Sequence, residues 1–256
     1  MTDVDDDRCE VGEGHVTDAD DHLGPYEAVT AHPEGETTVA RYAQTAADSE
    51  FAGVVVRTWE ASVDAAAVRE QTGVDVVSAV EVDADDPASA SGAVGNARPK
   101  CDVVIVRGGT STLNRFAVEQ DRVDVVAAPL QGDGDVDHVF AKTAREHRTY
   151  VEVNLGPVLR AAGGERVQHL QSLRKLRELL DYYDTPHVVS ARPSSHLEVR
   201  APRELVAVGE TVGFEPETVR AGLRAWGEIA RENRRRRSDS FIAPGVQRVT
   251  REEDTG

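Results

Sequence analysis

The densest cluster of polar residues follows a run of β-branched residues that ends at Arg107. It reads Arg107-Gly108-Gly109-Thr110-Ser111-Thr112-Leu113-Asn114-Arg115. Two glycines at a strand end, followed by hydroxyls and a helix start, would turn backbone N–H groups and the positive end of the helix toward a phosphate. The same pattern also fits a tight turn in which the glycines adopt positive φ. The spacing alone leaves both interpretations open.

Further basic residues collect where predicted strands end or helices begin. The arginine guanidinium suits bidentate contact with phosphate. A helix C-terminus needs one or two basic residues to complement its dipole, not the four of Arg234–Arg237. The pattern therefore favours contact with RNA or another partner, through residues drawn from Arg107, Arg115, Lys142, Arg145, Arg192, Arg200, Arg203 and Asn233–Arg237.

Neither metal chemistry nor nucleophilic catalysis is indicated. The eight histidines form no His-x-His and no His-x-x-Glu-His motif, and a first-row metal site needs at least three convergent ligands. Neither Cys9 nor Cys101 has a predicted activating neighbour, and no Gly-x-Ser-x-Gly elbow occurs. We therefore expect no catalytic residue and no metal ligand in this chain.

The charge of the chain is strongly negative. Its 256 residues include 46 acidic and 29 basic residues, which gives a net charge of −17, and only three of the basic residues are lysines. An acidic chain ordinarily avoids nucleic acid. Acidity with scarce lysine is also typical of proteins that work in molar salt, where the Debye length is about 3 Å. We favour the second interpretation, so net charge does not exclude RNA as a partner.

Composition divides the chain into three parts. Residues 1–25 hold nine acidic residues and one arginine without hydrophobic periodicity, and we expect a disordered acidic extension there. We expect a single α/β barrel domain over 26–249 and a disordered tail over 250–256. The start lacks the basic and apolar regions of a signal peptide, and no apolar run approaches the ~20 residues that span a bilayer. We therefore expect a cytoplasmic protein without a membrane partner.

Short β-branched runs alternate with helical periodicity between these ends. The runs are nearly continuous in Val, Ile and Ala, which is typical of strands buried on both faces of a parallel sheet. Seven strands with intervening helices predict either a (β/α) barrel or an open doubly wound sheet. No Gly-x-Gly-x-x-Gly follows the first strand, which favours a barrel of seven or eight strands. The predicted strands are Glu27–Ala31, Gly53–Arg57, Asp75–Val82, Asp102–Arg107, Asp124–Ala128, Thr149–Asn154 and His187–Ala191.

Helices are predicted in most of the gaps. Ser62 is a candidate N-cap, and Pro202 and Pro216 stand where first-turn prolines are tolerated. The segment Ala84–Lys100 is rich in Ala, Ser, Gly and Pro, and we expect a loop there with one short helix near Ala88–Asn96. The predicted helices are Thr38–Asp48, Ser62–Thr72, Asn114–Gln120, Val136–His147, Arg166–Tyr183, Arg203–Val212 and Pro216–Arg234.

Several motifs, in a fixed order, resemble the archaeal ribonuclease P protein component 3 family, the counterpart of the eukaryotic 30-kilodalton subunit. The resemblance covers Tyr26–Val246 and is of the haloarchaeal type. The motifs are Asp102-Val103-Val104-Ile105-Val106-Arg107-Gly108-Gly109, Asn114-Arg115, Ala117-Val118-Glu119, Val123-Asp124, Pro129, Asp137–Ala144, Val151-Glu152-Val153-Asn154, Pro186–Ala191, Arg200–Leu205, Asn233-Arg234 and Ile242–Val246.

The resemblance implies a TIM-like barrel related to metal-dependent phosphoesterase barrels but without their metal ligands. It implies a subunit that does not cut RNA itself. The RNase P RNA holds the Mg²⁺ ions and removes the 5′ leader of precursor tRNA, so the protein binds no cofactor of its own. The implied partners are the RNase P RNA, a small ferredoxin-like protein subunit, other RNase P proteins and, indirectly, precursor tRNA.

The resemblance also implies roles for individual residues. Arg107, Asn114 and Arg115 would lie at the barrel rim and contact RNA or hold the loop that does. Lys142, Arg200, Arg203 and Arg234 complete the predicted RNA-binding set. Two other functions remain open: a self-sufficient barrel enzyme that binds a phosphorylated metabolite at the Arg107–Arg115 loop, and a metallophosphoesterase with unrecognised ligands.

Overall fold

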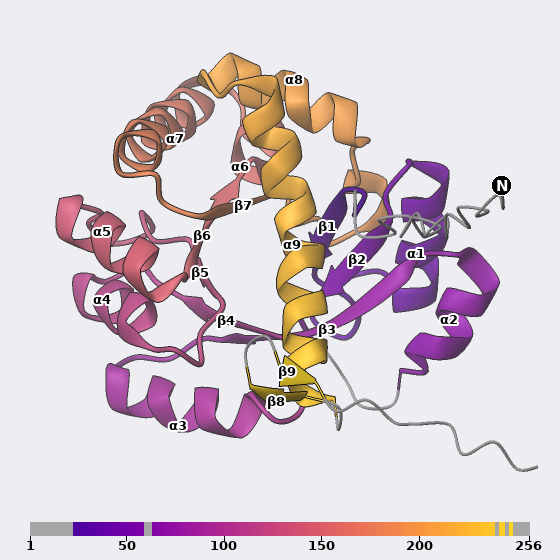
Figure 1. Cartoon of the computed structure of the whole chain (residues 1–256). Coiled ribbons are helices and arrows are strands. Elements are labelled where there is room, and N and C mark those ends of the chain that lie inside the picture. Colours follow the sequence, from indigo (N-terminus) through magenta and orange to yellow (C-terminus); the bar gives the residue numbers. More distant parts are fainter. Residues whose placement is uncertain (1–22, 59–62, 239–240, 244–245, 248–256) are drawn as a thin grey trace, which may run out of the picture.

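The chain folds as a barrel of parallel strands surrounded by helices (Figure 1). The computed structural model describes residues 23–58, 63–238, 241–243 and 246–247. Within them, seven strands pair side by side in the order of the chain, which confirms the predicted barrel and differs from the reversed order of a doubly wound sheet. They are β1 (Tyr26–Val29), β2 (Gly53–Val56), β3 (Asp75–Val82), β4 (Val103–Arg107), β5 (Val125–Ala127), β6 (Tyr150–Asn154) and β7 (His187–Ser190).

Helices connect successive strands. Pro202 and Pro216 each occupy a first helical turn, as predicted. A 3-10 turn, η1 (His196–Glu198), follows β7, and an antiparallel pair, β8 (Phe241–Ala243) and β9 (Val246–Gln247), follows the last helix. The helices are α1 (Val39–Asp48), α2 (Ala65–Thr72), α3 (Pro87–Ala97), α4 (Ser111–Glu119), α5 (His138–His147), α6 (Gly156–Arg160), α7 (Gly163–Tyr183), α8 (Pro202–Val212) and α9 (Pro216–Arg237).

The short helix expected near Ala88–Asn96 is present as the 11-residue α3, one residue longer at each end. Asp86 caps it by accepting hydrogen bonds from the backbone N–H groups of Ala88 and Ser89 at 2.8 and 2.9 Å, and the helix buries small apolar side chains. One local expectation needs correction. The cap of α2 is Asp64, and Ser62 lies outside the described residues. Most of the predicted extension and the whole tail also lie outside them.

Alternation along the strands separates two apolar cores. In β4, Val104 and Val106 point outward to the surrounding helices, whereas Val103 and Ile105 point into the barrel. The inner core is completed by α9, whose Trp226 is fully buried among these inward side chains. Figure 1 shows α9 lying across the ring of strands.

Glycines let α9 lie very close to the strands. A Cβ at Gly222 would lie 2.5 Å from a Val189 methyl, and one at Gly227 would lie 2.4 Å from the Tyr26 ring. Either contact is far below van der Waals distance, so the two positions exclude larger residues unless the helix moves.

The edge of β7 that faces β1 is closed by three different donors and acceptors. The indole N–H of Trp226 donates to the carbonyl of Val189 at 2.9 Å. Two residues along, the N–H of Ala191 donates to the Glu27 carboxylate at 3.0 Å. Two further along, the carbonyl of Pro193 accepts from Thr30 N–H at 3.0 Å. The backbone groups of alternate residues in a strand face the same edge, so these three hydrogen bonds form a seam that closes the barrel between β7 and β1.

The Trp226→Ala variant tests how far the barrel depends on α9. We expect it to lower the free energy of unfolding by about 3–5 kcal/mol, because a fully buried ring and its hydrogen bond are lost together. Chemical denaturation in about 2 M KCl, a salt chosen for an acidic chain, would measure this. Trp226→Phe is the matched control and should lose less, since it keeps most of the buried ring. Equal stability of the parent and the Ala variant would contradict the role of α9.

Candidate functional site at the barrel mouth

Charged side chains gather where the inward positions of the strands reach the carboxyl end of the barrel. Arg57 follows β2, Glu81 lies near the end of β3, Arg107 ends β4, Glu152 lies in β6, and Arg192 follows β7. Because side chains alternate between the two faces of a strand, these five point to the inside of the barrel near its carboxyl end. We call this group the mouth cluster.

The centre of the mouth cluster is a buried ion pair. The Arg57 side chain has no exposed surface, and both of its terminal nitrogens donate to Glu152, Nη2 to Oε2 at 3.2 Å. The Ser190 hydroxyl donates to the same carboxylate at 2.7 Å. Burial alone would lower the pKa of Arg57, but Glu152 and Glu81 raise it above its ordinary value. Arg57 therefore stays charged inside the barrel.

Glu81 receives three guanidinium groups. Arg57 Nε donates to it at 2.9 Å, Arg107 Nε at 3.0 Å, and Arg192 Nη2 to both of its oxygens at 3.0 Å. Burial would raise the pKa of Glu81, but the three arginines hold it below its ordinary value. The mouth cluster thus contains three arginines and two carboxylates, and the exposed carboxylate of Asp83 lies 3.4 Å from Arg107 Nε and offsets the remaining positive charge.

The mouth does not fit a divalent metal of the phosphoesterase type. Both carboxylates that point inward are already bound by Arg57, so a cation there would lie against a buried positive charge. In the part of the chain that the structure describes, no three His, Cys, Asp or Glu residues are grouped so that they could hold a metal ion.

A second buried carboxylate, Glu27, lies in the seam between β1 and β7. Its Oε1 accepts from the N–H groups of Ala28 and Ala191, each at 3.0 Å, whereas its Oε2 has no hydrogen-bond partner among the described residues. Burial raises its pKa from 4.5 to about 8, against the two backbone donors, and nearby Glu152 adds to the rise. Glu27 is therefore protonated over much of the neutral range.

The structure gives Asn114 and Arg107 supporting positions beside the mouth. Asn114 is 1 % exposed, and its side chain donates to Pro129 O at 2.7 Å and accepts from Gly109 N–H at 3.2 Å. It therefore fixes the glycine turn to the loop after β5. Gly109 has a φ of 107°, so the tight-turn interpretation is correct for this glycine. Arg107 lies at the rim but is half-buried against Glu81.

Four other predicted residues lie apart on the outer surface. Arg115 on α4 is 77 % exposed and pairs with Glu119 one turn later. Lys142 on α5 lies over the Tyr183 ring at 5.5 Å. Arg203 on α8 is 78 % exposed, close to Glu50, and Arg200 donates to the carbonyls of Leu197 and Val199 in its own loop. Their contact with RNA stays a prediction.

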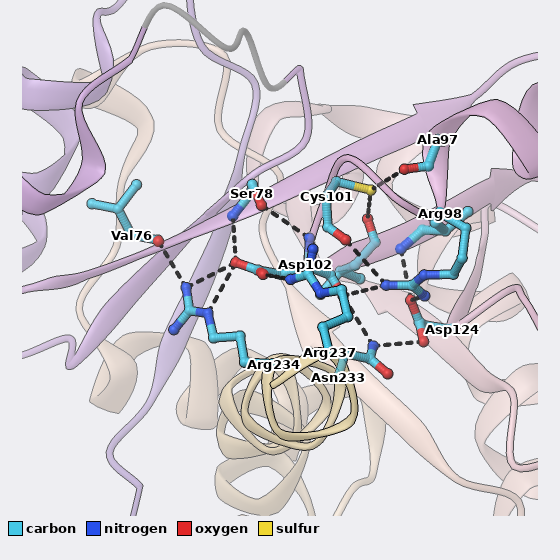
Figure 2. A network of polar contacts seen from close by, with 12 residues as sticks. Val76, Ser78, Ala97, Arg98, Cys101, Asp102, Asp124, Asn233, Arg234 and Arg237 are labelled. Atoms are coloured by element: carbon cyan, nitrogen blue, oxygen red, sulfur yellow. Dashed lines mark hydrogen bonds and ion pairs between the residues drawn. The ribbon is translucent and has the colours of Figure 1, made fainter. Parts of the chain in front are cut away.

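Arg234 serves the opposite end of the barrel. It donates to Asp102 Oδ2 at 3.0 Å, to Asp75 Oδ2 at 2.8 Å and to Val76 O at 2.9 Å. Figure 2 shows Arg234 reaching from α9 to Val76 and Asp102. The neighbouring Asn233 bonds Asp102 O and Asp124. The arginine run therefore anchors the end of α9, and the predicted set does not form one cluster.

Sequence reasoning missed the centre of the mouth. Arg57 was assigned only as the end of a strand, and Glu27, Glu81 and Glu152 were included in strands without a role. A charge inside a run of otherwise apolar strand residues, as in Val151-Glu152-Val153, is the signal that could have found them.

Comparison with known proteins identifies the family. The family model described as RNase P subunit p30 matches residues 24–238. The chain belongs to the RNase P subunit p30 family. Ribonuclease P protein component 3 of Halorubrum lacusprofundi is 58 % identical over 90 % of this chain and 99 % of its own length, and that of Haloarcula marismortui is 55 % identical over 87 % and 96 %.

Solved structures support the same barrel. A chain in a cryo-EM structure of archaeal ribonuclease P with mature tRNA matches this p30-family chain with a TM-score of 0.76 at 23 % identity, over 90 % of this chain and all of that one. A Xaa-Pro dipeptidase matches with a TM-score of 0.55 at 10 % identity, over 83 % and 76 %. At these identities the likeness concerns the fold alone.

The Arg57→Met variant tests the buried ion pair. It leaves Glu152 and Glu81 without their central partner, and we expect a loss of about 3–5 kcal/mol in the free energy of unfolding. The double variant Arg57→Met/Glu152→Leu removes one stranded charge and should recover part of that loss. Chemical denaturation of both variants measures the effect. A single variant within about 0.5 kcal/mol of the parent would refute it.

The Glu27→Gln variant tests the protonated carboxyl in the seam. Between its unfolded pKa of 4.5 and its folded pKa of about 8, Glu27 binds a proton only in the folded chain. The parent should therefore lose stability as pH rises through this window, and the variant should lose less. Thermal unfolding of both proteins at several pH values measures the difference. Parallel pH profiles would contradict the shifted pKa.

Proposed function

We propose that this chain is the component 3 protein subunit of ribonuclease P, the ribonucleoprotein that removes the 5′ leader from precursor tRNA. The observation that carries the proposal is the 58 % identity to a ribonuclease P protein component 3 over nearly its full length. In this role the chain supports the folding and activity of the catalytic RNA, which holds Mg²⁺ and performs the hydrolysis. The chain itself binds no cofactor.

The mouth chemistry supports a scaffold rather than an enzyme. Glu81 and Glu152 are held by arginines, and a carboxylate with a lowered pKa, such as Glu81, is a poor general base at neutral pH. The buried Cys101 thiol is bonded to Ala97 O, and burial raises its pKa to about 11. These groups therefore offer no acid–base pair or activated nucleophile.

The predicted RNA-binding residues divide by exposure. Arg115, Lys142 and Arg203 present charged groups to solvent and are suited to direct phosphate contact. Arg107, Asn114, Arg200 and Arg234 are bound by neighbouring groups in the chain and are suited to holding the loops and helices that approach the RNA. The family model and the relatives that match this chain do not support the alternative of a self-sufficient metabolite enzyme at the Arg107–Arg115 loop.

The proposed assembly contains the RNase P RNA, a small ferredoxin-like protein subunit and other RNase P proteins, with precursor tRNA engaged indirectly through the RNA. One solved structure with this fold comes from archaeal ribonuclease P with mature tRNA. Among the described residues, no helix is both long and apolar enough to cross a bilayer. We place the assembly in the cytoplasm.

Reconstitution tests the proposed role. RNase P RNA and the small partner protein are assayed for precursor-tRNA cleavage at limiting Mg²⁺ in about 2 M KCl, with and without this chain. We expect the chain to enhance cleavage. Arg115→Ala and Arg107→Ala should each reduce the enhancement, the first through a lost phosphate contact and the second through the rim loop. Single substitutions of each histidine serve as controls and should leave the enhancement unchanged.

Two results would overturn the proposed role. One is cleavage of precursor tRNA by the chain alone. The other is the absence of any effect on the RNA at every Mg²⁺ concentration, although circular dichroism shows the chain to be folded.

A further inference from the structure

Arginines of the mouth cluster line one wall of a cavity at the barrel mouth. The cavity has a volume of about 520 Å³ and lies between the loops after β5, β6 and β7 and the inner side of α7. That volume lies within the range of about 300–1,000 Å³ that small-molecule sites occupy. It is at the carboxyl end of the strands, where parallel barrels hold their ligands.

One wall of the cavity is lined by guanidinium groups, those of Arg107, Arg160 and Arg192. Of the nearby acids, Glu81 and Glu152 are bound by arginines of the mouth cluster, Asp83 lies 3.4 Å from Arg107 and Glu198 lies 3.5 Å from Arg160. Among the described residues, no partner occupies Arg107 Nη1 or the Nε and Nη1 of Arg192. Burial is the main cause that lowers the pKa of Arg192, and the charge of Arg57 adds to it, whereas Glu81 and Glu152 oppose the shift.

The opposite wall is apolar with amides at its edge. Leu173 and Leu176 of α7 face the cavity together with Pro129, Leu130 and Pro157. The side chains of Gln131 and Asn154 lie between the two walls and can donate hydrogen bonds. A ligand that matches these walls has an anionic group for the arginines and a flat or apolar part for the leucines. Polar atoms at the rim of that part would accept hydrogen bonds from the two amides.

The backbone beside the cavity is strained at two lining residues. Ala128 has a φ of 50° and Arg192 a φ of 48°, and both lie in the left-handed region that side chains other than glycine disfavour. Each follows a strand, β5 or β7. Such strain clusters at ligand sites, so its presence at two lining residues of one cavity is an observation independent of the charge.

We propose that this cavity binds a small organic phosphate of nucleotide size, with the phosphate against Arg107 and Arg192 and the body against Leu173 and Leu176. The phosphate comes either from a free nucleotide or from the 5′ end of an RNA strand, and the same chemistry holds both. This binding does not depend on the proposed role in ribonuclease P.

Calorimetric titration of the full chain in about 2 M KCl tests the site. The probes are AMP, inorganic phosphate, adenosine and a 5′-phosphorylated RNA trinucleotide. We expect AMP to bind more tightly than inorganic phosphate, because it also covers the apolar wall, and adenosine not to bind. A trinucleotide that binds more tightly than AMP and is displaced by it identifies an RNA end as the source, whereas tighter binding of AMP identifies a free nucleotide.

Three variants distinguish the contribution of the arginine wall to binding from that of the apolar wall. Arg192→Gln should weaken AMP and inorganic phosphate by about tenfold each, since a charge-assisted contact is lost. Ser172→Trp, at an exposed cavity position on α7, should weaken the binding of AMP and leave the binding of inorganic phosphate unchanged. The indole would occupy the space that the adenosine part of AMP needs, while the arginines stay in place. Arg220→Gln, on α9 and outside this cavity, is the control and should bind like the parent.

The proposal fails if the folded parent binds none of the phosphates, or if inorganic phosphate binds as tightly as AMP. It also fails if Arg220→Gln weakens binding as much as Arg192→Gln does. Precursor-tRNA cleavage by the reconstituted complex is measured on the same variants. Full enhancement by Ser172→Trp together with lost AMP binding supports a site separate from the RNA role.

Discussion

The whole barrel depends on how its seven-stranded parallel sheet is closed between β7 and β1, the two strands at the ends of the sheet. If the backbone N–H and C=O groups on the free edge of β7 had no partners, they would be open to pairing with another chain. If they were buried instead, each unsatisfied group would cost roughly 1–3 kcal/mol. Trp226, Glu27 and Thr30 satisfy the Val189, Ala191 and Pro193 groups in turn. Trp226 comes from α9, whereas Glu27 lies in β1 and Thr30 directly follows it. This requirement explains why α9 must lie against the strands, why two of its glycines have no room for a side chain, and why a carboxyl is buried in the seam.

The same closure decides what the mouth can do. Once the strands are fixed in register, their inward positions near the carboxyl end must be filled, and this chain fills them with Arg57, Glu81 and Glu152 instead of metal ligands. A fully bonded ion pair in a barrel centre holds the surrounding loops in one arrangement but leaves no carboxylate free to take a proton. The buried ion pair therefore holds the strand ends, and the loops that follow them, in one arrangement.

Local patterns predicted the strands and most helices, because the β-branched runs are buried on both faces and most of the helices bury an apolar stripe. They could not place Asn114, whose polar side chain is buried because the loop after β5 folds back onto the glycine turn. Nor could they show that Arg234 is bound by Asp75 and Asp102, which are distant in the sequence. Roles that depend on pairing between distant segments follow from the barrel register, which composition does not encode.

The ion pairs inside the barrel and those on its surface respond differently to salt. In concentrated salt, exposed pairs such as Arg203 with Glu50 are screened over about 3 Å and add little to stability. The Arg57–Glu152 pair is shielded from ions by its burial and keeps its strength. An acidic chain with a net charge of −17 can then hold its fold through buried ion pairs while its surface charge serves hydration. Contact with a polyanion in such salt must come from placed guanidinium groups at short range, not from the field of the whole molecule.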